Sequence, residues 1–214
     1  MLNLVTTPDH DVLAAAVGDW TGLAAADAAR LAAAFERREV AGGEAVALPG
    51  DARHEVLFVA RGLLRFYYPG ADGREANKAF VAEGAFAGAI AAATLDVPIL
   101  YGIEALEDSV VLAAPYARLD ALMTAHAPLE RFGRRLAERI LARKERRARS
   151  LLLESATERY LDFCDAEPDL VQRVPQRHIA SLLGMTDVHL SRVRRALAEA
   201  SSGDGARDGV LNLG

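Results

Sequence analysis

Cysteine is almost absent from this chain of 214 residues, and several other features are missing altogether. The single cysteine, Cys164, excludes an internal disulfide and cannot alone hold an iron–sulfur cluster. No apolar run approaches the ~20 residues that a membrane-spanning helix needs. The N-terminus has neither the basic region nor the cleavage-site pattern of an export signal. We therefore expect a cytoplasmic protein that does not enter a membrane.

The sequence also lacks the common catalytic motifs. It has no nucleophile elbow, no phosphate-binding glycine loop, and no HExxH or CxxC pair. Haem ligation needs a suitably placed histidine, and no motif supports His54 or His126, which are better explained as surface histidines. We expect no enzymatic activity, no cofactor and no bound metal.

Charge is present but unevenly distributed. The net charge is −5, with 9 basic and 18 acidic residues in 1–130, 9 and 2 in 131–150, and 7 and 10 in 151–214. Positive charge therefore gathers just before the C-terminal part of the chain. Because the local field attracts nucleic acid, this distribution is compatible with DNA binding but does not establish it.

Residues 175–197 have the pattern of a helix-turn-helix. Ala180 is placed where two crossing helices come closest, Gly184 where the first must end, and Thr186 where a hydroxyl caps the second. Pro175 suits the first turn of a helix. The apolar positions of the shared core are Ile179, Leu183, Met185, Leu190 and Val193.

The second helix of this motif is expected to point Leu190, Val193 and Leu197 inward. Its opposite face is polar, and a helix of this kind suits insertion into the DNA major groove. Arg192 is able to donate two hydrogen bonds to guanine and Val188 to contact a thymine methyl, while Arg194 is expected at phosphates. The residues expected to contact DNA are Gln176, Arg177, Thr186, Asp187, Val188, His189, Ser191, Arg192 and Arg195.

Two alternatives stay open for this motif. It is also compatible with a surface helix carrying solvated arginines, or with a helix pair inside an unrelated α-domain. His189 suits a phosphate or solvent as well as it suits a base.

The first half of the chain predicts helices and then a small antiparallel roll. Residues 10–36 have helical spacing in an alanine-rich background. From about Glu39, short apolar runs alternate with turn signals as far as Pro115. These runs are EAVAL, EVLFVARG, LLRFYY, NKAFVA, YGIEAL and SVVLAA.

A long helix is predicted from about Pro128 to Ser150 or slightly beyond. Its apolar seam has coiled-coil-like spacing and favours a partner helix, and hence a homodimer, although packing on its own roll is the alternative. The arginine-rich stretch 143–149 suits either solvent or DNA. The seam consists of Leu129, Phe132, Leu136 and Ile140.

Another helix begins near Ser155, a plausible cap, and leads into the helix-turn-helix. After Leu197, SSGDGARDG predicts a flexible stretch, and VLNL at 210–213 the last strand of a wing.

The order of these parts resembles the Crp/Fnr family of bacterial transcription regulators over nearly the whole chain. The resemblance is sharpest in ERYLDF, VPQRHIASLLGMTDVHLSRVRR and LEDSVVLAAP. It implies an α+β fold in three parts. These are an N-terminal β-roll of the cyclic-nucleotide-binding, jelly-roll type with flanking helices (1–127), a long dimerisation helix (128–153) and a C-terminal winged helix-turn-helix (154–214). Ser191 and Arg192 match the SR pair by which many members read their operators, whereas Val188 replaces a base-contacting glutamate.

The sensor departs further from the family. Members that bind cyclic AMP have Phe-x-Gly-Glu and then Arg-Ser/Thr-Ala, but this chain has FAGA at 86–89 and ILY at 99–101. Both charged ligands are missing, and each charge-assisted hydrogen bond contributes about 1.5–3 kcal/mol. Cyclic AMP in the usual pose is therefore not expected. The candidate pocket either takes an apolar ligand or is filled by core side chains, and we favour the filled pocket. Its residues are Phe86, Ala87, Gly88, Ala89, Ile90, Ile99, Leu100 and Tyr101.

The sequence therefore predicts a homodimeric DNA-binding transcription regulator that reads a palindromic operator. The alternative is a small-ligand sensor whose roll binds a cyclic nucleotide in an altered pose. The expected partners are double-stranded DNA and a second copy of the chain, with RNA polymerase and an unidentified small effector as further candidates.

Overall fold

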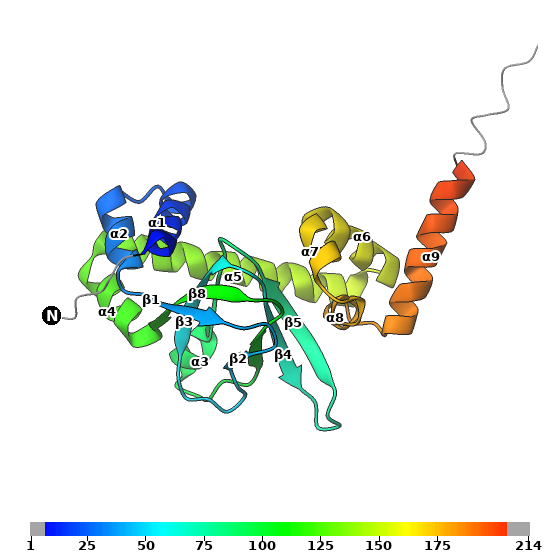
Figure 1. Cartoon of the computed structure of the whole chain (residues 1–214), viewed down its shortest axis with the longest axis horizontal. Helices are drawn as coiled ribbons and strands as arrows, with labels where there is room; N and C mark the ends of the chain where they lie inside the picture. The colour runs from blue at the N-terminus through cyan, green and yellow to red at the C-terminus, as the bar shows by residue number, and fades with distance from the viewer. Residues whose placement is uncertain (1–6, 205–214) are drawn as a thin grey trace, which may run out of the picture. The chain divides into compact units, whose positions relative to one another are not determined.

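The computed structural model describes residues 7–204. The chain divides into two compact units, residues 1–143 and 144–214, and the division falls inside the long helix α5 (Ala127–Leu153). Figure 1 shows the elements of each unit. Within the described residues, no helix is long and apolar enough to cross a membrane.

The first unit contains a β-roll made of two four-stranded antiparallel sheets. One sheet has the order β1-β8-β3-β6 and the other β2-β7-β4-β5. The strands are β1 (Glu36–Val40), β2 (Ala45–Ala47), β3 (Glu55–Arg61), β4 (Leu64–Pro69), β5 (Glu75–Val81), β6 (Phe86–Gly88), β7 (Gly102–Ala105) and β8 (Ser109–Pro115). The roll expected from the short apolar runs is therefore confirmed.

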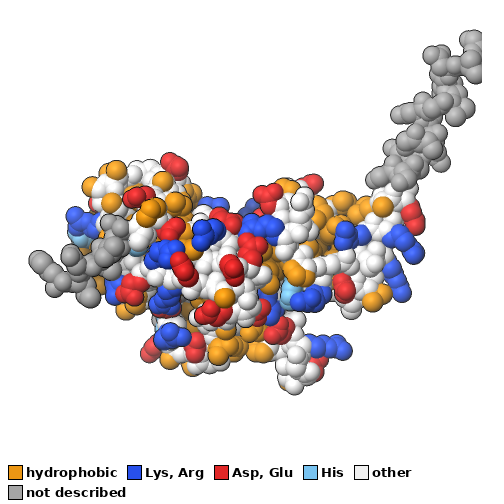
Figure 2. All heavy atoms as spheres, in the orientation of Figure 1, with side chains coloured by type: hydrophobic (Ala, Val, Ile, Leu, Met, Phe, Trp, Pro, Cys, Tyr) orange, Lys and Arg blue, Asp and Glu red, His pale blue; other side chains and the backbone are white. Residues whose placement is uncertain are grey.

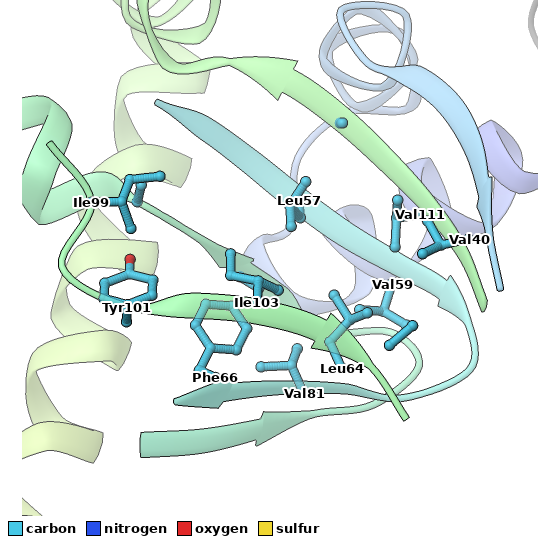
Figure 3. Close-up of a cluster of buried hydrophobic side chains, with 14 of the residues drawn as sticks. Val40, Leu57, Val59, Leu64, Phe66, Val81, Ile99, Tyr101, Ile103 and Val111 are labelled. Atoms are coloured by element: carbon cyan, nitrogen blue, oxygen red, sulfur yellow. The ribbon is translucent and has the colours of Figure 1, made fainter. Parts of the chain in front are cut away.

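The core of the roll lies between the two sheets. Leu57 and Val59 of β3 face Phe66 and Ile103 of the opposite sheet, as Figure 3 shows. The same strand buries Val56 and Phe58 on its other face. Because both faces of β3 are covered, its sequence is a continuous apolar run rather than an alternation.

Helices cover the outer face of the sheet that contains β3 and β8. They are α1 (Pro8–Thr21), α2 (Ala25–Ala32), α4 (Tyr116–Ala125) and the first half of α5, whereas the short α3 (Ile90–Leu95) follows β6. The helical region expected at 10–36 is two helices, separated at Gly22, where φ is +69°. It gives way to β1 at Glu36, which the sequence did not predict.

The prediction that the apolar seam of α5 forms a dimer interface is wrong, because the seam is buried within its own unit. Leu129, Phe132 and Leu136 are buried against the helices and strands of their own unit, and Ile140 packs partly on the same cluster. Phe132 makes edge-on ring contacts with Trp20 and Phe86 at centroid distances of 5.7 and 5.4 Å. The alternative was right because the outer face of β3 and β8 itself needs an apolar cover.

As far as Asp204, the last residue that the structure describes, the second unit contains the end of α5 and four further helices. These are α6 (Ala156–Ala166), α7 (Pro168–Arg173), α8 (Gln176–Leu182) and α9 (Asp187–Asp204). Ser155 caps α6 as predicted: its hydroxyl accepts a hydrogen bond from Glu158 N at 3.2 Å. Helix α9 continues past Leu197 to Asp204, so the first four residues of the stretch expected to be flexible, 201–204, are helical, and the rest of it, 205–209, lies outside the described residues. The expected wing strand at 210–213 lies outside the described residues.

Candidate nucleic-acid interface

Helices α8 and α9 are joined by a short turn at Gly184 and lie where the sequence predicts a helix-turn-helix. Ile179 of α8 and Leu190 and Val193 of α9 are buried, and Leu190 is fully so. Gly184 has a φ of +68°, and a Cβ there would come within 3.0 Å of the Leu151 side chain. Glycine is therefore favoured twice at the turn, by the backbone conformation and by the close approach of α5.

Two arginines bind the carbonyl groups at the end of α8. Arg159 of α6 donates from Nε to the Leu183 oxygen at 2.8 Å, and Arg147 of α5 donates to the Leu182 oxygen. Burial, together with the neighbouring positive charge of Arg159, lowers the pKa of Arg147 below its ordinary value. Arg147 thus has a structural role inside the 143–149 cluster, which the sequence assigned only to solvent or DNA.

The start of α9 is capped as expected. The hydroxyl of Thr186 accepts a hydrogen bond from the backbone N–H of His189 at 3.2 Å. Asp187 is the first residue of the helix, where a negative charge interacts favourably with the helix dipole.

The outward face of α9 exposes side chains that the sequence analysis expected to contact DNA. Val188 is 63% exposed, and Ser191 and Arg192 are exposed as well. Arg192 makes no hydrogen bond or ion pair with any residue of 7–204, so its guanidinium is available to an external acceptor. Figure 2 shows the arginine side chains of α9, in blue, gathered along this helix.

The other arginines of this helix differ from Arg192. Arg195 lies 3.5 Å from Glu199, an exposed i,i+4 pair of little energetic weight. Arg194 donates to Gln176 Oε1 at 2.5 Å, and Gln176 donates to Asp187 Oδ1 at 3.1 Å. The sequence placed Arg194 at phosphates and did not predict this link between the two helices.

The predicted effector pocket is largely filled by the core of the roll. Ala87, Ala89, Ile99 and Tyr101 are all buried in that core. The cavity beside them measures about 10 Å³, enough for about one water molecule. Its polar lining comes from Asp51, Arg53 and Glu55, none of which was predicted.

Three of the expected pocket residues lie elsewhere, which corrects the prediction. Leu100 is 71% exposed, and Phe86 and Ile90 pack in the cluster beneath the helices rather than inside the roll. Phe86 belongs to a short edge strand, where neighbouring residues point to opposite faces. Its ring lies 5.1 Å from that of Phe58.

Close packing requires a glycine at position 88 of the FAGA segment. Gly88 has a φ of +142°, and a Cβ there would lie 2.4 Å from the Glu55 carbonyl oxygen. The Gly88 carbonyl accepts a hydrogen bond from the Tyr101 hydroxyl at 2.9 Å. Burial, with a smaller effect from Tyr68, raises the pKa of Tyr101 to about 12.

The histidines considered for haem have ordinary partners. His54 Nε2 lies 2.8 Å from the Val97 carbonyl oxygen, and His126 Nε2 lies 2.9 Å from an Arg30 nitrogen. Among residues 7–204, no cluster of three or more potential ligands is arranged to hold a metal ion.

The family model "Cyclic nucleotide-binding domain" matches residues 37–126, the roll and α4. No curated protein sequence matches the chain. Among solved structures, FixK2 from Bradyrhizobium japonicum is similar at 20% identity and a TM-score of 0.68, covering 78% of this chain and 86% of its own. The resemblance to Crp/Fnr regulators holds at the level of the fold.

Two further structures support this assignment of the fold. CLP of Xanthomonas campestris, described as a c-di-GMP-responsive global regulator, is 21% identical with a TM-score of 0.67, and 83% of this chain and 93% of that chain are covered. The catabolite activator protein of Thermus thermophilus is 23% identical with a TM-score of 0.55, and 93% and 90% are covered. At these identities the likeness concerns the fold.

Proposed function

We propose that this chain is a cytoplasmic, homodimeric transcription regulator of the Crp/Fnr type that reads a palindromic DNA operator through α9. One observation carries the proposal: α9 buries Leu190 and Val193 while it presents Arg192 without a partner in the described part of the chain. An arginine held in this way on a helix of a helix-turn-helix suits bidentate bonding to guanine O6 and N7.

The remaining exposed groups divide between base and backbone contacts. Val188 offers an apolar surface for a thymine methyl group. Arg177 and Arg195 are exposed, and their charges position the domain on phosphates. Contacts to phosphate orient the protein on any duplex, whereas Arg192 supplies preference for one sequence.

The homodimer is proposed to use the other face of α5. The predicted seam is occupied by its own unit, but Leu141 and Leu152 are 59% and 81% exposed, with the exposed Ala148 between them. The spacing of Leu141, Ala148 and Leu152 is seven and then four residues, which keeps them near one side of a helix. Pairing along this side sets two copies of α9 about one DNA turn apart, ~34 Å.

Cyclic AMP in the usual pose is not part of the proposal. The roll lacks both charged ligand positions, and the cavity of about 10 Å³ leaves no room for a nucleotide beside its core side chains. Calorimetry with cyclic AMP, cyclic GMP and cyclic dinucleotides tests this point, and we expect no heat of binding. Micromolar binding of any of them would instead support a sensor with an altered pose.

The test of DNA binding compares two arginines of one helix on two kinds of DNA. The operator is first selected from random duplexes with the full chain. Arg192→Ala should then weaken binding to that operator about 10- to 100-fold and leave binding to random DNA nearly unchanged. Arg195→Ala should weaken both alike. Equal losses on both kinds of DNA for Arg192→Ala would contradict the assignment.

A further inference from the structure

One glutamine side chain joins the two helices of the motif at their exposed rim. Gln176 is the first residue of α8, and its Nε2 donates to Oδ1 of Asp187, the first residue of α9, at 3.1 Å. Its Oε1 accepts from Arg194 Nη1, two turns further along α9, at 2.5 Å. The three side chains therefore form one chain of hydrogen bonds.

The partners fix the orientation of the Gln176 amide. An arginine only donates and an ionised carboxylate only accepts, so the amide oxygen faces Arg194 and the amide nitrogen faces Asp187. The reverse orientation would place an amide nitrogen against a guanidinium and an oxygen against a carboxylate. The linkage thus has one arrangement, and it determines where the Asp187 carboxylate points.

Asp187 retains an open acceptor in this arrangement. Oδ1 accepts the bond from Gln176, and no other hydrogen-bond donor to the Asp187 side chain occurs among residues 7–204. The residue is exposed in the first turn of α9, beside Val188. On a recognition helix, the first turns are those that reach base edges in the major groove.

A carboxylate in this place discriminates among bases by hydrogen-bond polarity. Guanine offers two acceptors and thymine an acceptor and a methyl group, so neither pairs with an oxygen that only accepts. Cytosine offers the N4 amino group as a donor, and adenine offers N6 beside the N7 acceptor. A carboxylate that approaches adenine N6 is repelled by the neighbouring N7, which also only accepts. Cytosine is therefore the better partner for a single carboxylate oxygen.

We propose that Asp187 is a specificity-determining residue that accepts a hydrogen bond from the exocyclic amino group of a cytosine, and that Gln176 and Arg194 position it. This inference rests on the proposed function and names one further base of the same operator. The positioning is needed because a free aspartate rotates and is repelled by nearby phosphates. Gln176 holds the carboxylate in one direction, and Arg194 in turn fixes the Gln176 amide through its bond to Oε1.

The experiment determines base preference at every operator position by selection from random duplexes with the full-length protein. Wild-type protein should prefer cytosine at one position per half-site by about tenfold over thymine. Asp187→Ala should abolish this preference and keep the guanine preference that depends on Arg192. Retention of the cytosine preference by Asp187→Ala would overturn the inference.

A second variant separates base reading from folding. Asp187→Asn keeps the shape of the side chain but adds donors, and asparagine pairs with adenine N6 and N7. Its preference should change from cytosine to adenine at the same position, a gain that misfolding does not produce. An unchanged preference would overturn the inference.

The positioning role has its own readout and a matched control. Gln176→Ala should reduce the cytosine preference about threefold or more, whereas the base preferences at the other operator positions should stay as in the wild type. Gln172→Ala, an exposed glutamine of the same unit, should change neither. A uniform loss at all positions for Gln176→Ala would overturn its positioning role. If the wild-type protein selects no sequence, the proposed function itself fails, which is a different outcome from the failure of Asp187 alone.

Discussion

The Arg159 guanidinium lies 2.8 Å from the carbonyl oxygen of Leu183, the C-cap residue that follows α8. The last carbonyls of a helix have no partner within the helix, and a cation is favoured at this end of the dipole. Arg159 also donates to the Glu154 carbonyl oxygen at 2.5 Å. One side chain of α6 therefore connects the end of α5 with the turn that precedes α9.

Loss of this side chain should destabilise the second unit. Arg159→Met should lower the free energy of unfolding by about 1–3 kcal/mol, because carbonyls that accept a charged donor lose it. Urea denaturation followed by circular dichroism measures the change. Arg146→Met, an exposed arginine of the same unit, is the control and should change it by less than about 0.5 kcal/mol. Equal effects of the two substitutions would contradict the role of Arg159.

Gly88 should tolerate no side chain. A Cβ at this position meets a backbone oxygen at 2.4 Å, and the φ of +142° is strained for any other residue. Gly88→Ala should cost about 2–4 kcal/mol of stability. Gly84→Ala, at a φ of +74° with open space around it, should cost only about 1 kcal/mol. Denaturation midpoints that fail to separate the two variants would refute this account of the FAGA segment.

The two faces of α5 should respond differently to substitution. Phe132→Ala should lower the stability of the roll unit by about 3–5 kcal/mol, since it opens a cavity among aromatic rings. Leu152→Asp replaces an exposed residue, so it should leave unfolding nearly unchanged and weaken the dimer. Sedimentation equilibrium measures the dimer and chemical denaturation the stability. Unchanged dimerisation in Leu152→Asp would locate the interface elsewhere.

Tyr101 should make stability depend on alkaline pH. Its pKa is about 12 in the folded chain, because burial disfavours the phenolate, and about 10 when unfolded. The unfolded state therefore loses this proton first, and the stabilising contribution, complete below pH 10, falls as the pH rises towards 12. The loss attributable to Tyr101 amounts to about 2–3 kcal/mol.

The free energy of unfolding between pH 9 and 12 tests this dependence. Wild-type protein should lose more stability over this range than Tyr101→Phe, which has no phenol to ionise there. Parallel pH profiles for the two proteins would show that Tyr101 does not titrate as described.

Local patterns predicted the elements whose burial is regular. The continuous apolar runs of β3 and β8 indicate strands that are covered on both faces. The helix period correctly placed Ile179, Leu183, Leu190 and Val193 in the core of α8 and α9, whereas Met185 and Leu197 are only half-buried. β1 was missed because it is an edge strand with exposed Arg37 and Glu39 and therefore lacks an apolar run.

Contacts between distant residues were not predictable from those patterns. The spacing of Leu129, Phe132 and Leu136 is the same whether the helix packs on a partner or on its own sheet. The spacing alone therefore does not distinguish a dimer interface from packing within the unit. The bonds of Arg147 to α8 and of Arg194 to Gln176 depend on how helices cross, and single arginines in a charged stretch carry no sign of their partners.

The central claim, a dimer that reads DNA through α9, is tested most directly by selecting duplexes from a random pool with the full-length chain. The account predicts enrichment of an inverted repeat whose half-site centres lie about one DNA turn, ~34 Å, apart, with a guanine that Arg192→Ala no longer selects. A pool that shows no enriched sequence, or an enriched sequence that Arg192→Ala selects equally well, would contradict it.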